Sequence, residues 1–174
     1  ESIMAYNIQT GETLEKIRET WIAENDQKIK GSADMNPGHR TNFSERGQKN
    51  MADFMDAIGK FEDDEDLEYF NHVQHVLFNS PAVVYLALPK DHTKWSIYDL
   101  GGFGMSLMLA ATDLGVNSIP AYELVKYPYI LRENLPIPDD EDIIMGVALG
   151  YESEEHINTY ESPRLDLDEI LKIN

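Results

Sequence analysis

Two histidines and a run of carboxylates are the side chains whose spacing could bind a metal ion. His72 and His75 lie three residues apart on an expected helix, a separation at which both imidazoles can reach one ion. No third ligand stands out beside them. The acidic run from Glu62 to Asp66 lacks the alternating ligands and the central glycine of an EF-hand calcium loop. We therefore expect the histidines to lie on the surface of a helix and the carboxylates to lie at a solvated helix start. We expect no metal site.

The sequence Gly-Gly-Phe-Gly at residues 101–104 could cradle a phosphate. It matches neither the dinucleotide fingerprint nor the P-loop, because the third glycine is missing and no Gly-Lys-Ser/Thr follows. Close packing of a helix explains these glycines better. Ser106 and Ser118 are not preceded by the residues of a nucleophile elbow. We therefore predict no side chain that is itself catalytic.

Arg164, in the segment Ser-Pro-Arg, is one of only 14 basic residues against 32 acidic ones. An arginine among so many carboxylates usually forms an ion pair. Its planar fork can also grip phosphate oxygens through two parallel hydrogen bonds. Both interpretations of Arg164 stay open on position alone.

Composition bounds the class of protein. A formal charge of -18 repels nucleic-acid phosphates and anionic membranes, so we expect neither as a partner. The chain has no cysteine, which excludes disulfides, thiolate nucleophiles and iron–sulfur ligation by cysteine. A length of 174 residues suits one domain, and we find no signal peptide or transmembrane run. We therefore expect a cytoplasmic protein with a single domain over 1–174, in which 152–174 forms a C-terminal arm.

The element that must position any site is a helix expected from Gly101 to Leu114, which is apolar almost all round. Such a helix in a soluble protein is buried on most sides. A row of mostly small residues (Gly101, Gly104, Met108, Ala111, Gly115) would let another backbone come close. Gly115 is placed to end the helix. We expect the following residues, Ser118 to Glu123, to form a turn that lines a pocket.

The rest of the chain predicts a mixed α/β domain in which helices outnumber strands. A polar stretch from Lys30 to Lys49 is expected to be a long, functional loop. The other expected elements are strands at Ala5–Gln9, Pro81–Leu88 and Asp142–Tyr151, and helices from about Thr13 to Ile29, from Met51 to Phe61, from the acidic run to Leu77, and from Pro128 to Leu135.

An ordered set of segments resembles the FMN-dependent nitroreductase family. Asn7 to Glu15 resembles the strand and helix entry that follow the family's Gln-Pro-Trp, and Phe78 to Val83 resembles the entry to one of its strands. The set continues with Asp99 to Val116, Ile119-Pro-Ala, Tyr127 to Pro138, Val147-Ala-Leu-Gly-Tyr, Asn158 and Ser162 to Ile170. The similarity covers nearly the whole chain and is nearest to the branch with a long mid-chain insertion and a Ser-Pro-Arg tail.

The resemblance implies an α+β fold, with a central antiparallel or mixed sheet flanked by helices, in an intertwined homodimer. The apolar helix would pack at the dimer core, and two FMN molecules would lie at the interface. Arg164 matches the arginine that holds the FMN phosphate, and Gln74 matches a position where the family often has an asparagine near the flavin pyrimidine. Residues that match the segment along the isoalloxazine are Ser118, Pro120, Ala121, Tyr122 and Glu123.

The activity that the resemblance implies is electron transfer from NADH or NADPH through bound FMN to nitroaromatics, quinones or similar flat acceptors, by a ping-pong mechanism. The family's opening Arg-x-Ser-x-Arg and Pro-Ser-x-x-Asn-x-Gln-Pro-Trp segments are not matched, so we expect the N-terminal part of the family domain to be absent from this chain. Two alternatives stay open. One is a flavin-free, non-catalytic dimeric module for binding or regulation, and the other keeps flavin for a different reaction such as reductive dehalogenation.

Overall fold

The computed structural model describes residues 4–61 and 64–172, which form two compact units. One unit, called here the sheet unit, comprises the chain up to Pro37 and from Asn71 to Glu152. The other, called the helical unit, comprises Gly38–Phe70 and the chain from Ser153 onward.

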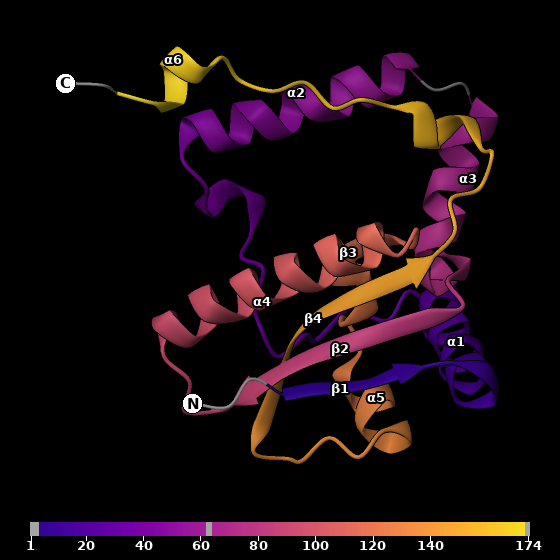
Figure 1. The fold of residues 1–174 in the computed structure, drawn as a ribbon. Coiled ribbons are helices and arrows are strands. Elements are labelled where there is room, and N and C mark those ends of the chain that lie inside the picture. Colours follow the sequence, from indigo (N-terminus) through magenta and orange to yellow (C-terminus); the bar gives the residue numbers. More distant parts are fainter. Residues whose placement is uncertain (1–3, 62–63, 173–174) are drawn as a thin grey trace. The chain divides into compact units, whose positions relative to one another are not determined.

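The sheet unit is built on four strands in the order β1-β2-β4-β3, and every neighbouring pair is antiparallel (Figure 1). The strands β1 (Met4–Gln9), β2 (Ala82–Pro89) and β4 (Glu141–Gly150) confirm the three predicted strands to within a residue or two. The fourth, β3 (Asn117–Ala121), was predicted as part of a turn, and that prediction was wrong. The segment pairs with β4 instead, with Ser118 opposite Leu149 and Pro120 opposite Val147.

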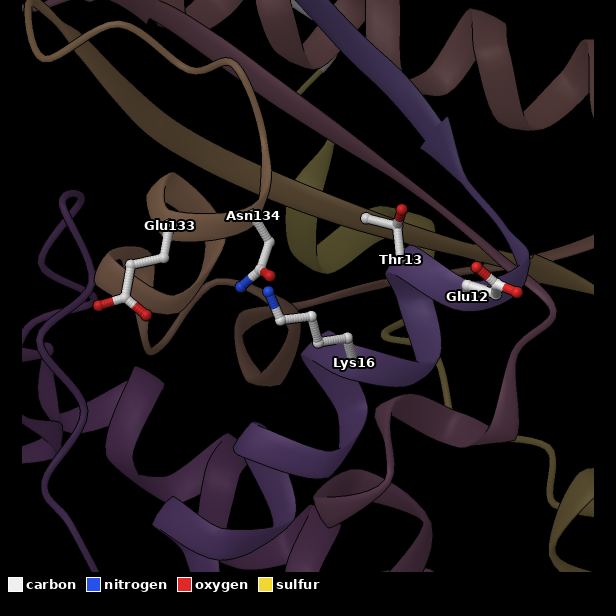
Figure 2. A pocket seen from close by; sticks show the side chains of 5 residues that line it. All are labelled: Glu12, Thr13, Lys16, Glu133 and Asn134. Carbon is white, nitrogen blue, oxygen red and sulfur yellow. The ribbon is translucent and has the colours of Figure 1, made fainter.

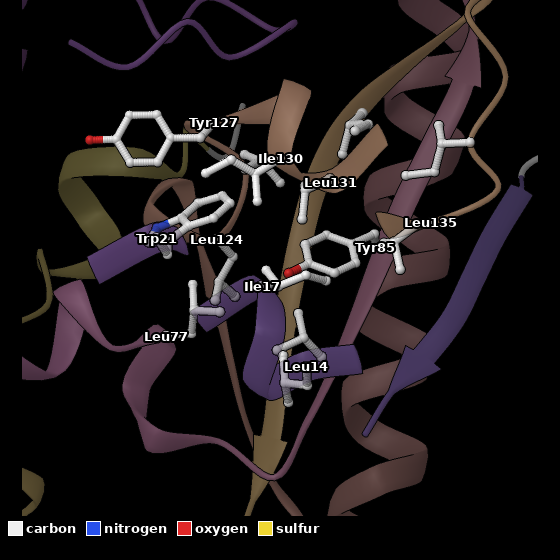
Figure 3. Packing of buried hydrophobic residues seen from close by; sticks show 14 of the residues in the cluster. Leu14, Ile17, Trp21, Leu77, Tyr85, Leu124, Tyr127, Ile130, Leu131 and Leu135 are labelled. Atoms are coloured by element: carbon white, nitrogen blue, oxygen red, sulfur yellow. The ribbon is translucent and has the colours of Figure 1, made fainter. Parts of the chain in front are cut away.

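The two faces of the sheet carry different helices, because successive side chains of β2 point to opposite sides. On one face, Val83 and Tyr85 pack with α1 (Gly11–Asp26) and α5 (Pro128–Asn134). On the other, Val84, Leu86 and Leu88 pack with α4 (Lys94–Asp113). The first face holds the larger core, shown in Figure 3.

α1 follows from a helical spacing of apolar residues, since Leu14, Ile17 and Trp21 recur on one side and are fully buried. The indole of Trp21 lies edge-on against the ring of Tyr127, with 5.0 Å between ring centroids (Figure 3). α1 ends at Asp26, three residues before the predicted end. α5 confirms the predicted helix opening on Pro128, which suits a first helical position.

α4 differs from its prediction in both length and burial. It begins at Lys94, because Thr93 and Ser96 form a capping box in which each side chain bonds the other's main chain. Within this chain α4 buries only Ser96, Leu100 and Gly104. A β-carbon on Gly104 would meet the Leu86 side chain at 3.5 Å, so what packs against this glycine is a side chain. The opposite face exposes Tyr98, Met105 and Leu109.

Gly115 ends α4 as predicted. It has φ +75°, its N–H donates to the Thr112 carbonyl, and the Val116 N–H donates to the Ala111 carbonyl. This pair of bonds is a Schellman motif, in which the left-handed conformation favours glycine.

Gly115→Ala is expected to lower the free energy of unfolding by about 1 kcal/mol, because alanine is strained at positive φ. Thermal unfolding followed by circular dichroism measures this change. Gly59→Ala is the matched control, since Gly59 lies inside a helix with open space around its α-carbon and should be neutral or stabilising. An equal loss of unfolding free energy in Gly115→Ala and Gly59→Ala would contradict the strain argument.

The helical unit contains α2 (Glu45–Phe61), most of α3 (Asp64–His75), and two short helices of the C-terminal arm. α2 begins before its predicted start, so the predicted Lys30–Lys49 loop is shorter than expected and also contains a 3-10 turn, η1 (Arg40–Asn42). Glu62 and Asp63, in the acidic run, lie outside the described residues.

Within the helical unit, the arm contributes η4 (His156–Thr159) and α6 (Leu167–Ile170). Arg46 pairs with Glu169 at 3.2 Å, and His156 Nδ1 lies 2.7 Å from Asp66. These contacts bind the arm to α2 and α3. Across the described ranges, none of the helices combines the length and hydrophobicity that crossing a bilayer demands. The prediction of one domain with an arm stays a prediction.

Candidate functional site

The structure brings five of the predicted site residues together on one continuous segment. Ser118, Pro120 and Ala121 lie on β3, and Tyr122 and Glu123 follow on the 3-10 helix η3 (Tyr122–Leu124). β3 is an outer strand of the described sheet, so one row of its main-chain groups faces away from β4. An outer strand also tolerates Pro120, which has no N–H to donate. The segment from Ser118 to Glu123, called here the ridge, is therefore partly exposed and presents main-chain polar groups.

The Glu123 carboxylate is already engaged by a lysine that was not predicted. Lys126, three residues along, forms an ion pair with Glu123 and is only 9% exposed. Its ammonium also donates to Asn25 Oδ1 at 2.6 Å and lies 5.2 Å from the Tyr127 ring centroid. The carboxylate of Glu123 is thus held by the protein, and a ligand at this ridge would meet the main chain of Glu123 and not its side chain.

A second ion pair holds the segment that follows α1. The Asp34 carboxylate accepts hydrogen bonds from both terminal nitrogens of Arg132, at 3.3 and 2.8 Å, and another from the Ile143 N–H at 2.8 Å. Arg132 donates in addition to the Glu141 carbonyl at 2.6 Å. Both charges are largely buried, with 15% and 19% of the side chains exposed. Such a bidentate pair is among the stronger polar contacts in proteins.

Three tyrosines, Tyr122, Tyr127 and Tyr129, have raised pKa values and stay protonated. Burial first, and then the Glu123 carboxylate, raise the pKa of Tyr122. Burial, followed by Glu123 and Glu24, raises the pKa of Tyr127. Burial, and then the hydrogen bond that Tyr129 donates to Glu24 at 2.6 Å, raise the pKa of Tyr129 well above its usual 10.0. The phenols therefore stay protonated across the physiological range.

These shifts predict a loss of stability in alkali. The raised pKa favours the neutral phenol in the folded state, so its contribution is complete below pH 10 and is lost as the pH rises above that value. In Tyr129→Phe, the dependence of unfolding free energy on pH above 10 is expected to be shallower by up to about one proton.

Denaturant unfolding at a series of pH values from 8 to 11.5 tests this prediction. Tyr151→Phe is the control, because Tyr151 is 83% exposed and its removal should leave the slope unchanged. An identical slope in wild type and Tyr129→Phe would contradict the assignment.

Gln74 lies in the last turn of α3, apart in sequence from the ridge and half-buried. The chain then makes a left-handed turn, with positive φ at Leu77, Phe78 and Asn79. Arg18 on α1 holds this turn, because its guanidinium donates to the Val76 carbonyl at 3.0 Å and the Ser80 carbonyl at 2.6 Å. The position of Gln74 is therefore tied to α1.

Arg164 belongs to the helical unit and is exposed. One terminal nitrogen, Nη1, makes all of its hydrogen bonds, to the Ser162 carbonyl at 3.0 Å, to the Ser162 hydroxyl, and to the Pro163 carbonyl. Within the part of the chain that the structure describes, the edge formed by Nε and Nη2 makes no hydrogen bond. That edge is one of those with which arginine can grip an anion through two parallel bonds.

A surface hollow of about 310 Å³ is lined by α1 and α5 (Figure 2). Its lining residues are Glu12, Thr13, Lys16, Glu133 and Asn134. Glu12 lies about 20 Å along α1 from Asn25, which contacts Lys126, so the hollow is at the far end of the helix from the ridge. None of the predicted site residues lines it.

Sequence reasoning missed the residues that support the ridge. The spacing of Glu123 and Lys126 could have indicated an ion pair across one helical turn. Asn25, Asp34 and Arg132 gave no local signal, because the contacts through which they support the ridge join residues at least nine positions apart. For the predicted histidine pair, the described ranges contain no group of three or more His, Cys, Asp or Glu placed to hold one ion.

Comparisons with known proteins agree with the fold. The structure superposes on the FMN-dependent nitroreductase NfnB from Mycobacterium smegmatis, in complex with NADPH, with a TM-score of 0.84 and 24% identity, covering 99% of this chain and 78% of that one. It superposes on the FMN and NADPH-dependent nitroreductase NfnB from sphigopyxis sp. strain HMH with a TM-score of 0.83 and 19% identity, covering 99% and 79%. These likenesses confirm the predicted nitroreductase-like α+β fold.

Among curated sequences, the nitroreductase NfnB of Mycolicibacterium smegmatis is 28% identical over 133 residues, which are 73% of this chain and 56% of the relative. The 4-nitrobenzoate reductase of Pseudomonas putida is 27% identical over 88 residues, which are 50% of this chain and 39% of that enzyme. The chain thus spans between about two fifths and three fifths of the length of these relatives. A family model, described as the nitroreductase family, matches residues 5–151, and because this is most of the chain, the protein belongs to the nitroreductase family.

Proposed function

We propose that this chain belongs to a flavin-dependent oxidoreductase that takes electrons from NADH or NADPH and passes them, through FMN, to nitroaromatics, quinones or similar flat acceptors. The observation that carries the proposal is the family match over residues 5–151. The relatives named above, a 4-nitrobenzoate reductase and FMN-dependent nitroreductases, support nitro reduction as the activity.

The ridge fits one side of a flavin. An isoalloxazine is a flat aromatic ring system with a polar edge, so it needs an apolar surface and main-chain donors and acceptors. The outward edge of β3, with exposed Pro120 and half-buried Ser118 and Ala121, has both properties. We propose contacts from Ser118, Pro120 and Ala121, and from Tyr122 and Glu123 mainly through their backbone. Gln74 is proposed to reach the pyrimidine ring.

The FMN phosphate is proposed to bind Arg164. The support is the open Nε–Nη2 edge of the guanidinium, while Nη1 is held by the Ser162 carbonyl and hydroxyl. A guanidinium that is oriented on one side and open on the other loses little side-chain entropy when it binds an anion.

FMN, when bound, would supply the redox chemistry between the reduced nicotinamide and the acceptor, in a ping-pong sequence. The chain's own groups bind and orient. The Lys126–Glu123 ion pair keeps the ridge next to the flavin electrically neutral, and Tyr122 presents a protonated phenol beside it. We therefore assign no catalytic side chain.

A homodimer is proposed to cover α4. The stripe of Tyr98, Gly102, Met105 and Leu109 follows one face of the helix, and Tyr98, Met105 and Leu109 are 75%, 55% and 63% exposed in the single chain. An apolar stripe of this length is unusual on a monomer surface. Packing against a second copy would satisfy the burial that the sequence of this helix demands.

An absorption spectrum of the purified protein in its full natural length, followed by anaerobic addition of NADPH and then of NADH, tests the proposal. A flavin spectrum that bleaches on addition of a reduced nicotinamide, and recovers when a nitroaromatic is added, is the expected result. Absence of flavin after incubation with FMN would overturn the proposal and favour a non-catalytic member of the fold.

A further inference from the structure

The segment from Ile29 to Asp34, which follows α1, is attached to the ridge and its continuation at several points. The Tyr127 hydroxyl donates to the Ile29 carbonyl at 2.8 Å, and the Ser32 N–H donates to the Lys126 carbonyl at 2.8 Å. This segment leads to Pro37, where the chain leaves the sheet unit. Its attachment therefore holds the last part of the sheet unit before the chain continues into residues 38–70 of the helical unit.

Gly31 lies directly against the ridge. A β-carbon at this position would be 2.6 Å from the Tyr122 hydroxyl, 3.1 Å from Lys126 Cβ and 3.4 Å from the Lys126 carbonyl oxygen. The φ angle of Gly31 is not in the left-handed region, so space and not backbone conformation calls for glycine here. Real β-carbons essentially never come within 3.0 Å of a heavy atom outside the neighbouring residues, so the phenol would have to shift. The absence of a side chain at Gly31 therefore leaves room for the phenol of Tyr122, and this close contact is called here the seat.

Asp34 is the second anchor. Its carboxylate is bonded by both terminal nitrogens of Arg132 and by the Ile143 N–H, and it is largely buried. Removing one partner of such a network leaves a buried charge without its full set of bonds. The segment is thus held at both ends, by Tyr127 and Gly31 near its start and by Asp34 near its end.

We propose that Gly31 and Asp34 are positioning residues. Asp34 holds the segment from Ile29 to Asp34 on α5 and β4, and Gly31 lets that segment lie against η3. Together they hold the ring of Tyr122 at the ridge, an arrangement called here the clamp, and thereby set the size of acceptor that the site admits. The inference rests on the proposed function only in its last part, because the clamp itself is a property of the folded chain. Tyr122 is 37% exposed, so its ring is accessible to a flat acceptor while its hydroxyl is seated on Gly31.

A double-mutant cycle on Gly31 and Tyr122 tests the seat. Gly31→Ala is expected to lower the melting temperature by about 4 °C, because the new methyl group displaces the phenol. Tyr122→Phe removes the atom that clashes, so the double variant should recover at least half of that loss, a clear departure from additivity. The melts are measured on flavin-free protein and again after incubation with FMN.

Limited trypsin digestion tests the anchor. Arg40, an exposed residue three positions beyond Pro37, is the cleavage site that reports on release of the segment. Asp34→Asn keeps the shape but removes the charge, and cleavage after Arg40 is expected to be about tenfold faster, because the rate tracks the population of the open form. Asp139→Asn, at an exposed position, is the control and should be cut at the wild-type rate.

Acceptor selectivity is the third measurement. In Gly31→Ala, the ratio of kcat/KM for a two-ring quinone to that for a single-ring nitroaromatic is expected to change roughly fivefold, and Tyr122→Phe in the same background should restore it. Additive melting temperatures, or unchanged cleavage in Asp34→Asn, would overturn the clamp even if flavin binds. If no flavin binds, the melts and the digestion still decide on the clamp, and only the proposed function and the selectivity role fail.

Discussion

Replacing Arg164 with alanine is expected to weaken FMN binding by about 10- to 100-fold. The expectation follows from the loss of two charge-assisted hydrogen bonds to phosphate, a contribution of about 1.5–3 kcal/mol. Because Arg164 is exposed and its protein bonds are to Ser162 and Pro163, the substitution removes little folding energy. The dissociation constant, measured by quenching of flavin fluorescence, should rise without a matching fall in the melting temperature of the flavin-free protein.

Two further variants separate phosphate recognition from general charge. Arg164→Lys keeps the charge but loses the fork, and it should recover only part of the affinity. Arg46→Ala removes another exposed arginine of the helical unit, the one paired with Glu169, and should leave FMN binding as in the wild type. Equal retention of FMN by Arg164→Ala and the wild type would remove Arg164 from the site.

Local patterns in the sequence predict most of the sheet unit. The helical spacing of Leu14, Ile17 and Trp21 gives α1, and the β-branched runs in β2 and β4 give strands buried on both faces. These signals succeed because each element carries its own buried face in its own residues. The resemblance to the family then supplied the overall fold, which the structural likenesses confirm.

Elements whose stability comes from neighbours were not predicted. β3 is short, contains a proline and has no alternation of apolar residues, so its strand conformation depends on pairing with β4. Gly31 and Asp34 matter through Tyr122 and Arg132, about 90 or more residues away, and no pattern local to residues 29–37 indicates them. The predicted site residues on the ridge came from the resemblance, and the ion pair that holds Glu123 became visible only in the structure.

The single chain supplies only part of the burial expected for α4, and this leads to the second large effect. The helix has enough apolar residues for two buried faces, yet the chain covers only the face of Leu100 and Gly104. If a second copy covers the other face, a charge placed there should separate the dimer. Leu109→Asp is therefore expected to weaken dimerisation by at least roughly 1,000-fold, because a two-fold interface contains the change twice and each copy loses about 2 kcal/mol or more of apolar burial.

Sedimentation velocity at several protein concentrations measures this effect, and circular dichroism checks that the variant stays folded. Folding should be preserved, since Leu109 is 63% exposed in the single chain and aspartate costs a helix interior only about 0.7 kcal/mol. Ala23→Asp is the matched control, because it places the same side chain on an exposed position of α1 and should leave the dimer intact. A wild-type protein that sediments as a monomer would contradict the proposed dimer, and a Leu109→Asp variant that stays dimeric would move the interface away from this stripe. A monomeric variant that also fails to retain FMN would place the flavin at the contact between the two copies, as the family resemblance implies.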